Sequence, residues 1–378
     1  MLTYSDLVDL GRALQGRTVL SVYVNWQEPD LAKRRRWRVE LRHSLNDIET
    51  WLSGAPHADR EAFASCRRAL LERFDEMRGR FRDPGWAAFY TADGEQYAGP
   101  VAAAVPTMAV WSVGPCLTPY IRALKEAHPV MVVVADARKA RVFRYAARKL
   151  EHLDTVRART VVEHPDHMSA PPRPGFHSGT HGTSGADQAQ RELRDGTAHM
   201  LNEVVSELAR NGKKAQWFVL GGIPSVAADL LSRLPAELAT HAARAEHLDV
   251  HATKAQIIEA ARQTASALRD ARDLRLVNDA VACSESNGFG VTGSVDTKRV
   301  LNQARAREVY FTEAFLANNA AAAEEIVRLA LGSRAFVEHV SGAAAARLDE
   351  VGGVAARLRY TVEAELPTTE EPEFAQTA

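Results

Sequence analysis

Residues 164–188 hold the densest group of side chains that could do chemistry. Four of them are histidines: His164, His167, His177 and His181. His177 and His181 are four residues apart, which on a helix would place both rings on one face and could bind a metal. They lie in a glycine- and serine-rich stretch instead, and no cysteine joins them. We therefore predict no metal here, and nothing in the sequence indicates a cofactor.

The second half of this stretch could hold an anion. Ser184 or Asp187 can cap the helix expected from Gln188 onward, and free N–H groups and the dipole at a helix N-terminus favour a phosphate. Gly182 and Gly185 let the backbone approach a ligand closely. The serine and the aspartate, with a nearby histidine, have the side chains of a catalytic triad, but no GxSxG elbow accompanies them. A disordered surface loop is the alternative.

A run of cations near the N-terminus could contact RNA phosphates. It consists of Lys33, Arg34, Arg35, Arg36, Trp37 and Arg38. The tryptophan could stack on a base or take part in a cation–π contact. On a helix these cations point around most of the circumference, so a solvated helix face is the alternative interpretation.

Two further motifs have weaker context. Gly288, Gly290 and Gly293 have the GxGxxG spacing of a dinucleotide-binding turn, with Glu313 about 20 residues later. Such a turn follows a strand, whereas the residues before this one have helical spacing, so we expect a flexible turn. Asp136 follows an expected strand and could be a nuclease carboxylate, but turn chemistry explains it.

Composition excludes several classes of protein. The 378 residues carry a formal net charge of −1, with 46% hydrophobic and 25% charged residues. A chain of this balance is not a general polybasic binder of nucleic acid, so any RNA contact must come from local patches. Three widely spaced cysteines favour reduced thiols. With no apolar run of membrane length and no signal-peptide pattern, we expect a cytoplasmic protein with neither membrane nor DNA as a partner.

The N-terminal third has alternating strand and helix signals. We expect strands at Thr18–Asn25, Gly85–Gly94 and Val101–Val113, and helices at Asp30–Leu52 and at about residues 59–80. These elements predict an α/β domain over residues 1–122.

The middle of the chain begins with a hairpin signal. Strands are expected at Val130–Ala135, Arg141–Tyr145 and Leu150–Val156, followed by the loop 164–188, a helix at Gln188–Asn211, a strand at Gln216–Gly222 and a helix at Ser225–Leu234. A loop this long inside a compact domain is usually functional or disordered. We predict a self-contained domain over residues 123–252.

The C-terminal part has a βαβαβ rhythm after a long helix. The helix is expected from about Thr253 to Ser286, and the later alternation predicts a small α/β sandwich over residues 253–365. Residues 366–378 are acidic and contain proline, which is typical of a disordered tail.

Taken in order, these segments resemble the archaeo-eukaryotic class of peptide-chain release factors and their bacterial relatives, a group that includes pelota. The residues that carry the resemblance are VMVVVADARKARVFRY, the glycine-rich loop before the Gln188–Asn211 helix, QWFVLGGIPSVAADLLSRLP, and VTGSVDTKRVLNQARAREVYFTE followed by GGVAARLRY. They span about residues 129–360. The resemblance implies a three-domain α/β chain with an RNase H-like middle domain and a small α/β sandwich at the C-terminus.

In that family the middle-domain loop carries a Gly-Gly-Gln tripeptide that helps water cleave peptidyl-tRNA, and this sequence lacks it. One alignment puts Gly182-Thr183-Ser184 at the tripeptide, and a shifted one puts Ala186-Asp187-Gln188 there. Neither offers two glycines before a glutamine, and Asp187 would repel a developing oxyanion. The resemblance therefore implies ribosome binding more than hydrolysis.

We accordingly expect a ribosome-associated factor that occupies the A site in hibernation or rescue, without codon-specific termination. Its partners would be ribosomal RNA and a translational GTPase. The RNA-binding residues would be those of the cationic run together with Gly182, Ser184 and Gly185. The first alternative is a peptidyl-tRNA hydrolase in which Gln188 or His181 orients water. The second is a metal- or nucleotide-binding stress protein.

Overall fold

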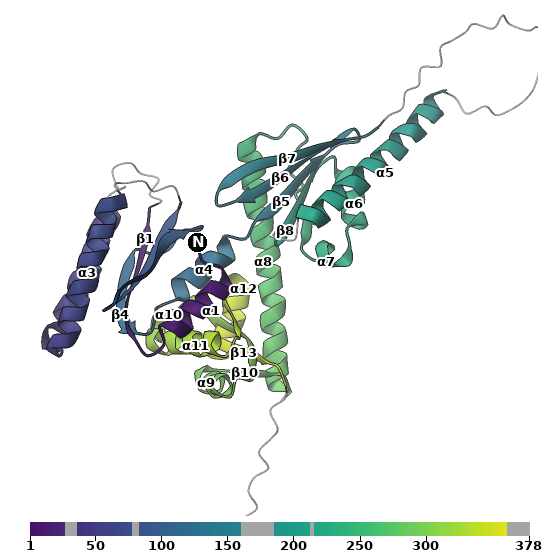
Figure 1. Cartoon of the computed structure of the whole chain (residues 1–378). Coiled ribbons are helices and arrows are strands. Elements are labelled where there is room, and N and C mark those ends of the chain that lie inside the picture. The colour runs from purple at the N-terminus through teal and green to yellow at the C-terminus, as the bar shows by residue number, and fades with distance from the viewer. Residues whose placement is uncertain (27–35, 78–82, 160–184, 212–214, 287, 361–378) are drawn as a thin grey trace, which may run out of the picture. The chain divides into compact units, whose positions relative to one another are not determined.

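The computed structural model describes residues 1–26, 36–77, 83–159, 185–211, 215–286 and 288–360. Residue contacts divide the chain into two units, one formed by residues 1–125 with 272–378 and the other by residues 126–271. The second unit is therefore an insertion in the first. Both units mix helices with sheets (Figure 1), which confirms the expected α/β class.

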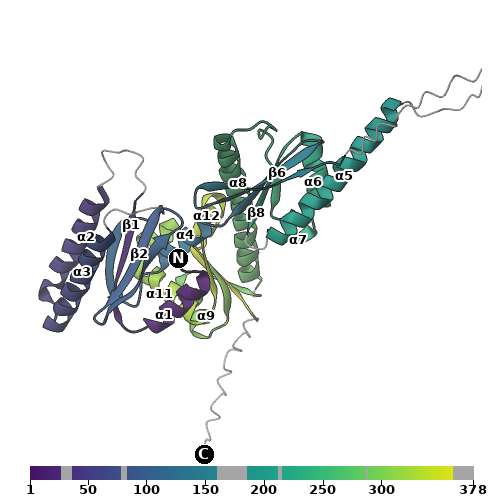
Figure 2. The ribbon, with the colours of Figure 1, turned by 45° about the horizontal axis from the view of Figure 1, so that its top comes forward.

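An antiparallel sheet with the order β3-β2-β1-β4 forms the N-terminal part of the first unit. Its strands are β1 (Thr18–Asn25), β2 (Gly85–Thr91), β3 (Gly94–Val101) and β4 (Met108–Val113). Helices α2 (Arg36–Trp51) and α3 (His57–Met77) lie side by side over one face (Figure 2). The strand expected at residues 18–25 is confirmed with the same bounds.

Nearly all side chains of β1 are buried because both faces of this strand are covered. Leu20 and Val22 point to the core under α2 and α3, whereas Val19 and Tyr23 join a different core on the opposite face. Successive side chains of a strand point to opposite faces, so a strand covered on both sides is apolar throughout.

The C-terminal part of the first unit contains a second sheet with the order β10-β13-β11-β12. Its strands are β10 (Gly290–Thr292), β11 (Ala306–Thr312), β12 (Phe336–Val340) and β13 (Val354–Leu358), and the helices around it are α9 (Ser294–Asn302), α10 (Glu313–Asn318), α11 (Ala320–Gly332) and α12 (Gly342–Asp349). Strand β12 runs parallel to β11, and β13 runs antiparallel to it. The strand–helix alternation expected from the sequence is confirmed here.

One hydrophobic core joins these two sheets. Helices α1 (Tyr4–Ala13) and α4 (Thr118–Glu126), which the sequence patterns did not reveal, contribute to it together with residues of both sheets and α11. The Tyr4 hydroxyl donates to the Ala335 carbonyl at 2.9 Å and accepts from the Val337 amide at 2.9 Å. Residues of both terminal segments pack together in this core, and the expected division into separate domains over residues 1–122 and 253–365 stays a prediction.

The second unit has a sheet with the order β7-β6-β5-β8-β9. Its strands are β5 (Val130–Ala135), β6 (Lys139–Ala146), β7 (Lys149–Arg157), β8 (Trp217–Gly222) and β9 (Ala242–Arg244). Neighbouring strands are antiparallel from β7 to β5, and β8 and β9 run parallel to β5. The expected hairpin and the third antiparallel strand are both confirmed.

Helices cover both faces of this sheet. Helices α5 (Gly185–Asn211), α6 (Pro224–Arg233) and α7 (Ala236–Ala239) cover one face, and α8 (Lys254–Glu285) covers the other. Ile257, Ala261 and Ala265 of α8 recur every four residues and pack against Val132 and Val134. The first half of α8 therefore belongs to the second unit, although the sequence patterns had placed it with the C-terminal domain.

We predict that two neighbouring glycines before β13 differ in their tolerance of alanine. Both have positive φ, +98° at Gly352 and +73° at Gly353. A Cβ on Gly353 would lie 2.9 Å from the Cβ of Phe315, whereas one on Gly352 meets nothing closer than 3.5 Å. Gly352→Ala should lower the free energy of unfolding by about 1–2 kcal/mol through backbone strain alone, and Gly353→Ala by about 3 kcal/mol or more.

Urea unfolding followed by tryptophan fluorescence measures the difference, since five of the six tryptophans belong to the first unit. Equal losses in the two variants would contradict the close approach at Gly353.

Candidate functional site

The loop singled out by the sequence joins β7 to α5. Residues 160–184 lie outside the described part of the chain, and His181, Gly182 and Ser184 are among them. Gly185 is the first residue of α5, and Gln188 lies in the first turn of that helix. The functional roles expected for these residues stay predictions.

The first turns of α5 extend beyond the sheet that the helix covers (Figure 1). Residues 190–195 include no buried position, and the first buried residue of the helix within its described side chains is Gly196. At 1.5 Å per residue, Gln188 is about 12 Å further along the helix axis than Gly196. The start of α5, from Gly185 onward, therefore extends beyond the body of the second unit.

Three backbone segments meet where α5 reaches the sheet. The Arg159 carbonyl oxygen lies 3.1 Å from the position of a Cβ on Gly196. The Thr197 hydroxyl lies 2.7 Å from the Ala137 carbonyl oxygen, and the Ala158 amide donates to the Arg138 carbonyl at 2.8 Å. The β5–β6 turn, the chain after β7 and α5 are thus held together at the base of the loop.

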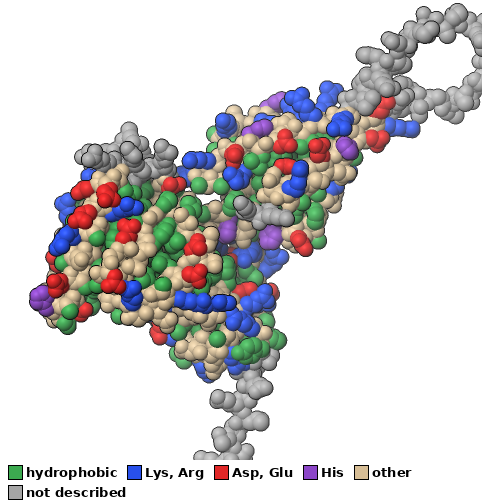
Figure 3. Space-filling view, viewed as in Figure 1, with side chains coloured by type: hydrophobic (Ala, Val, Ile, Leu, Met, Phe, Trp, Pro, Cys, Tyr) green, Lys and Arg blue, Asp and Glu red, His purple; other side chains and the backbone are tan. Residues whose placement is uncertain are grey.

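Asp136 shapes the turn at this base. Its Oδ1 accepts from the backbone amides of Arg138 at 2.7 Å and Lys139 at 2.8 Å. An aspartate that caps its own turn in this way has a structural role, as the sequence indicated, and the turn holds Arg138 at the surface. Figure 3 shows several Lys and Arg side chains, with Asp and Glu side chains among them, at this end of the second unit.

The cationic run of the N-terminal part is described only from Arg36 onward, and Lys33, Arg34 and Arg35 lie outside the described residues. Arg36 and Arg38 are exposed, and the Arg36 Nε lies 2.7 Å from the Glu40 carboxylate.

The Trp37 ring of the same run is buried, with 9% of its surface exposed, and contacts the rings of Trp26 and Phe74 edge-on or tilted. The Arg38 guanidinium lies 5.2 Å from the Trp37 ring centroid. This packing leaves no open face for a base, so the expected stacking of Trp37 on RNA is corrected to a core role with a cation–π contact.

The glycine motif of the C-terminal part does not have a dinucleotide-binding context. It follows helix α8, Gly290 lies within β10, and Gly293 is the N-cap residue of α9. A Cβ on Gly290 would lie 2.5 Å from the Ala280 carbonyl oxygen, so this glycine permits close packing of β10 against α8. The motif needs no ligand to explain it.

A groove of about 570 Å³ in the first unit lies among α1, α9 and α11. Two arginines line it, but Arg12 donates to the Gly332 carbonyl at 3.3 Å and Arg328 donates to the Val113 carbonyl. Both guanidinium groups are thus directed at backbone oxygens. Within the described ranges there is no group of three metal-ligating side chains, and no helix there is long and apolar enough to cross a membrane.

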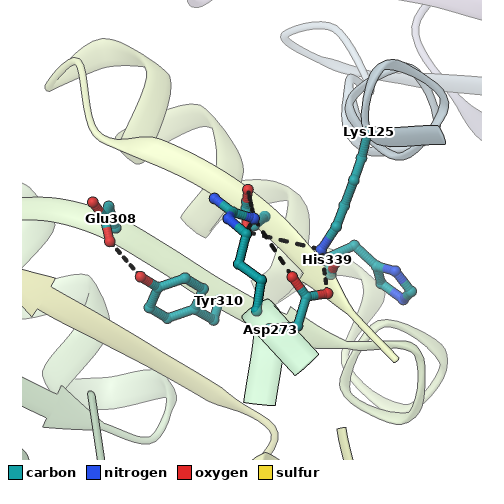
Figure 4. A network of polar contacts seen from close by, with 7 residues as sticks. Lys125, Asp273, Glu308, Tyr310 and His339 are labelled. Carbon is teal, nitrogen blue, oxygen red and sulfur yellow. Dashed lines mark hydrogen bonds and ion pairs between the residues drawn. The ribbon is translucent and has the colours of Figure 1, made fainter. Parts of the chain in front are cut away.

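A buried ionic network lies where the chain leaves and re-enters the first unit (Figure 4). The Lys125 ammonium, at the end of α4, lies 2.5 Å from the Asp273 carboxylate of α8 and donates to the His339 carbonyl at 2.6 Å. A single guanidinium nitrogen of Arg272, Nη1, donates to both carboxylate oxygens of Glu338 in β12, at 2.9 and 3.0 Å.

Burial sets the ionisation of this network. The Asp273 side chain is 1% exposed and that of Glu338 is 7% exposed. Burial raises the pKa of Asp273, and the adjacent Lys125 ammonium opposes that rise. With two cations facing two carboxylates, the charges balance inside the unit, as buried ions require.

His339 borders the network. Burial, and then the positive charges of Arg122 and Lys125, lower the pKa of His339 to about 4. Its Nε2 lies 3.3 Å from the carboxylate of Glu313, which is 61% exposed. The ring is therefore neutral at physiological pH.

The sequence patterns did not single out this network, although one signal was present. Asp273 stands four residues before Val277 and seven before Ala280, both buried in the core that α8 shares with β11 and α12. A carboxylate on the buried stripe of a helix indicates a buried partner. The partners Lys125 and Glu338 come from distant segments, so spacing alone does not reveal them.

One family model matches part of the chain, mostly within the second unit. Residues 115–266 match the family model described as bacterial archaeo-eukaryotic release factor family 10. No curated protein matches the chain.

Several solved structures share similarity with the chain. The Saccharomyces cerevisiae protein Dom34, described as a translation termination-like factor, is 12% identical with a TM-score of 0.44 over 62% of this chain and 64% of its own. Pelota from Archaeoglobus fulgidus is 13% identical with a TM-score of 0.38 over 96% and 93%. A ribosome-bound archaeal Pelota is 14% identical with a TM-score of 0.43 over 96% and 95%. The chain thus spans just under two thirds of Dom34 and most of each Pelota.

Acid should destabilise the first unit partly through His339. The unfolded chain protonates this ring below its ordinary pKa of 6.5, whereas the folded chain keeps it neutral down to about pH 4. The stability contributed by the neutral ring is therefore complete above pH 6.5 and is lost as the pH falls toward 4, by about 3 kcal/mol at most.

His339→Gln should remove this part of the acid sensitivity, while His43→Gln, at an exposed position on α2, should leave it unchanged. Urea unfolding measured at neutral and at mildly acidic pH compares the three proteins. The same acid-dependent loss in His339→Gln as in the wild type would contradict the role of this ring.

Proposed function

We propose that the chain is a ribosome-associated translation factor, because residues 115–266 match the model of bacterial archaeo-eukaryotic release factor family 10. The family match carries this proposal, since it covers the β5–β6 hairpin, the loop, α5 and the β8–α6 segment. The protein acts in the cytoplasm, where ribosomal RNA is its principal partner.

Within this function, we propose that the second unit enters the ribosomal A site with its loop leading. The geometry that supports this is the projecting start of α5, where Gln188 lies about 12 Å beyond Gly196 along the helix axis. Occupation of the A site serves hibernation or rescue rather than codon-specific termination. A translational GTPase is the further partner that the family resemblance implies.

Occupation of the site is favoured over hydrolysis by the backbone at Gln188. In the shifted alignment the tripeptide falls on residues 186–188, and these lie within the helical first turn of α5. The release-factor chemistry uses glycines that permit an unusual backbone and an amide that stabilises an oxyanion. A regular helical turn without glycine at 186 and 187 does not offer that backbone.

The chain should co-sediment with 70S ribosomes from a stationary-phase lysate at low salt, and it should slow the reaction of ribosome-bound peptidyl-tRNA with puromycin. A variant in which residues 164–184 are replaced by a short Gly-Ser linker should inhibit the puromycin reaction less, because the linker cannot fill the A site. The proposal fails if the full chain is absent from ribosome fractions under these conditions.

The hydrolase alternative is tested with purified chain, ribosomes and peptidyl-tRNA. We expect no release of peptide above the rate of ribosomes alone, in the wild type and in a Gln188→Ala, His181→Ala double variant. Gln190→Ala, an exposed glutamine two residues further along α5, is the matched control. Release by the wild type that the double variant loses and the control retains would replace A-site occupation with hydrolysis.

A further inference from the structure

The base of the loop carries a group of exposed arginines outside the cationic run noted in the sequence. We name them the loop-base arginines: Arg138, Arg157, Arg159, Arg191 and Arg194. The first three come from the β5–β6 turn and the chain around the end of β7, and the last two from the projecting turns of α5. The contacts of Gly196 and Thr197 described above hold these segments together.

Four of the loop-base arginines form two pairs whose spacing places both members of the pair on the same surface. Arg157 and Arg159 are exposed while Val156 is buried and Ala158 is partly buried, so the two arginines alternate outward. Arg191 and Arg194 are three residues apart on α5, a spacing that places them on neighbouring positions of one helix surface. The five arginines therefore lie on the three segments that meet at the base of the loop.

Among the described residues, none of the loop-base arginines forms an ion pair with a carboxylate. Arginines elsewhere in the same unit do pair: Arg144 with Glu151 at 2.7 Å, Arg210 with Glu207 at 2.5 Å and Arg233 with Asp229 at 2.8 Å. The nearby Asp136 is occupied by backbone amides. The turns of α5 that carry Arg191 and Arg194 also carry the exposed acids Glu192 and Asp195, so the excess positive charge comes chiefly from Arg138, Arg157 and Arg159. Such unpaired guanidinium groups create a local positive potential that an external polyanion would neutralise.

We propose that the loop-base arginines bind the phosphates of ribosomal RNA and so hold the second unit while its loop is inserted. Guanidinium groups match phosphate oxygens with two parallel hydrogen bonds, and a row of phosphates can engage cations from several elements at once. This inference rests on the proposed ribosome function and assigns RNA binding to residues outside both the loop and the cationic run.

The test measures binding of the full chain to 70S ribosomes and to purified large-subunit ribosomal RNA over a series of salt concentrations. The first variant, R138Q/R157Q/R159Q, is called the rim variant. It removes the charge of the three loop-base arginines that come from the β5–β6 turn and from the chain around the end of β7. The second, R191Q/R194Q, changes only exposed positions on the projecting turns, so it should fold even if the first does not. The control, R148Q/K149Q/R244Q, removes the same charge as the first from exposed positions at the β6–β7 turn and on β9.

The rim variant should bind RNA about tenfold more weakly or worse, and the slope of log affinity against log salt should fall by about 2–3, near one per lost phosphate contact. The second variant, R191Q/R194Q, should lower this slope by about 1–2, whereas the control should lower it by less than about one. Unchanged affinity and slope in both test variants would overturn the inference. So would a control that loses as much as the rim variant.

Two further outcomes separate the hypotheses. If the variants lose ribosome binding but bind RNA like the wild type, the partner of these arginines is an acidic protein and the inference is wrong. If the wild type binds RNA through them but does not bind ribosomes, the inference stands while the proposed function fails.

Discussion

The ion pair between Lys125 and Asp273 is the constraint on which the architecture depends. It joins the point where the chain leaves the first unit to the point where it returns, with its charged atoms 2.5 Å apart and Asp273 almost fully buried. Removing one partner of such a pair leaves an uncompensated buried charge, at a cost of about 3–5 kcal/mol. Glu338 and Arg272 extend the pair to β12, so that both crossing segments are attached to the core of the first unit.

An insertion with its ends fixed in this way can fold around its own core. The second unit has a hydrophobic core on each face of its sheet, because α5 and α6 cover one face and the first half of α8 covers the other. The buried β5 strand and the turn capped by Asp136 then fix where β7 ends and where α5 crosses the sheet. The projecting turns of α5 and the loop-base arginines owe their position to this packing. The proposed function uses that end of the unit.

Much of this fold could be predicted from the sequence. The strands at residues 18–25 and 130–135 have the expected bounds, since runs of apolar and β-branched residues between turn signals leave few alternatives. Helices α1 and α4 were not expected. The first is short and depends on a capping box at Thr3 and Asp6 together with packing against distant segments.

The site was less predictable for a physical reason. Local spacing identifies a loop and a basic segment, but it does not show whether an aromatic ring faces solvent, and Trp37 proved to be a core residue. Likewise, Arg138, Arg157 and Arg191 are far apart in the sequence and form one group only after β7 and α5 have packed. Clusters built by long-range contacts need the fold before they can be seen.

The central claim is that the loop-bearing end of the second unit meets large-subunit ribosomal RNA. Cryo-electron microscopy of the chain bound to ribosomes tests this most directly. The account predicts residues 185–195 of α5 and the loop-base arginines against the RNA backbone, with the loop directed at the peptidyl-transferase centre. A bound chain whose second unit faces solvent, or contacts the ribosome through its opposite end, would contradict it.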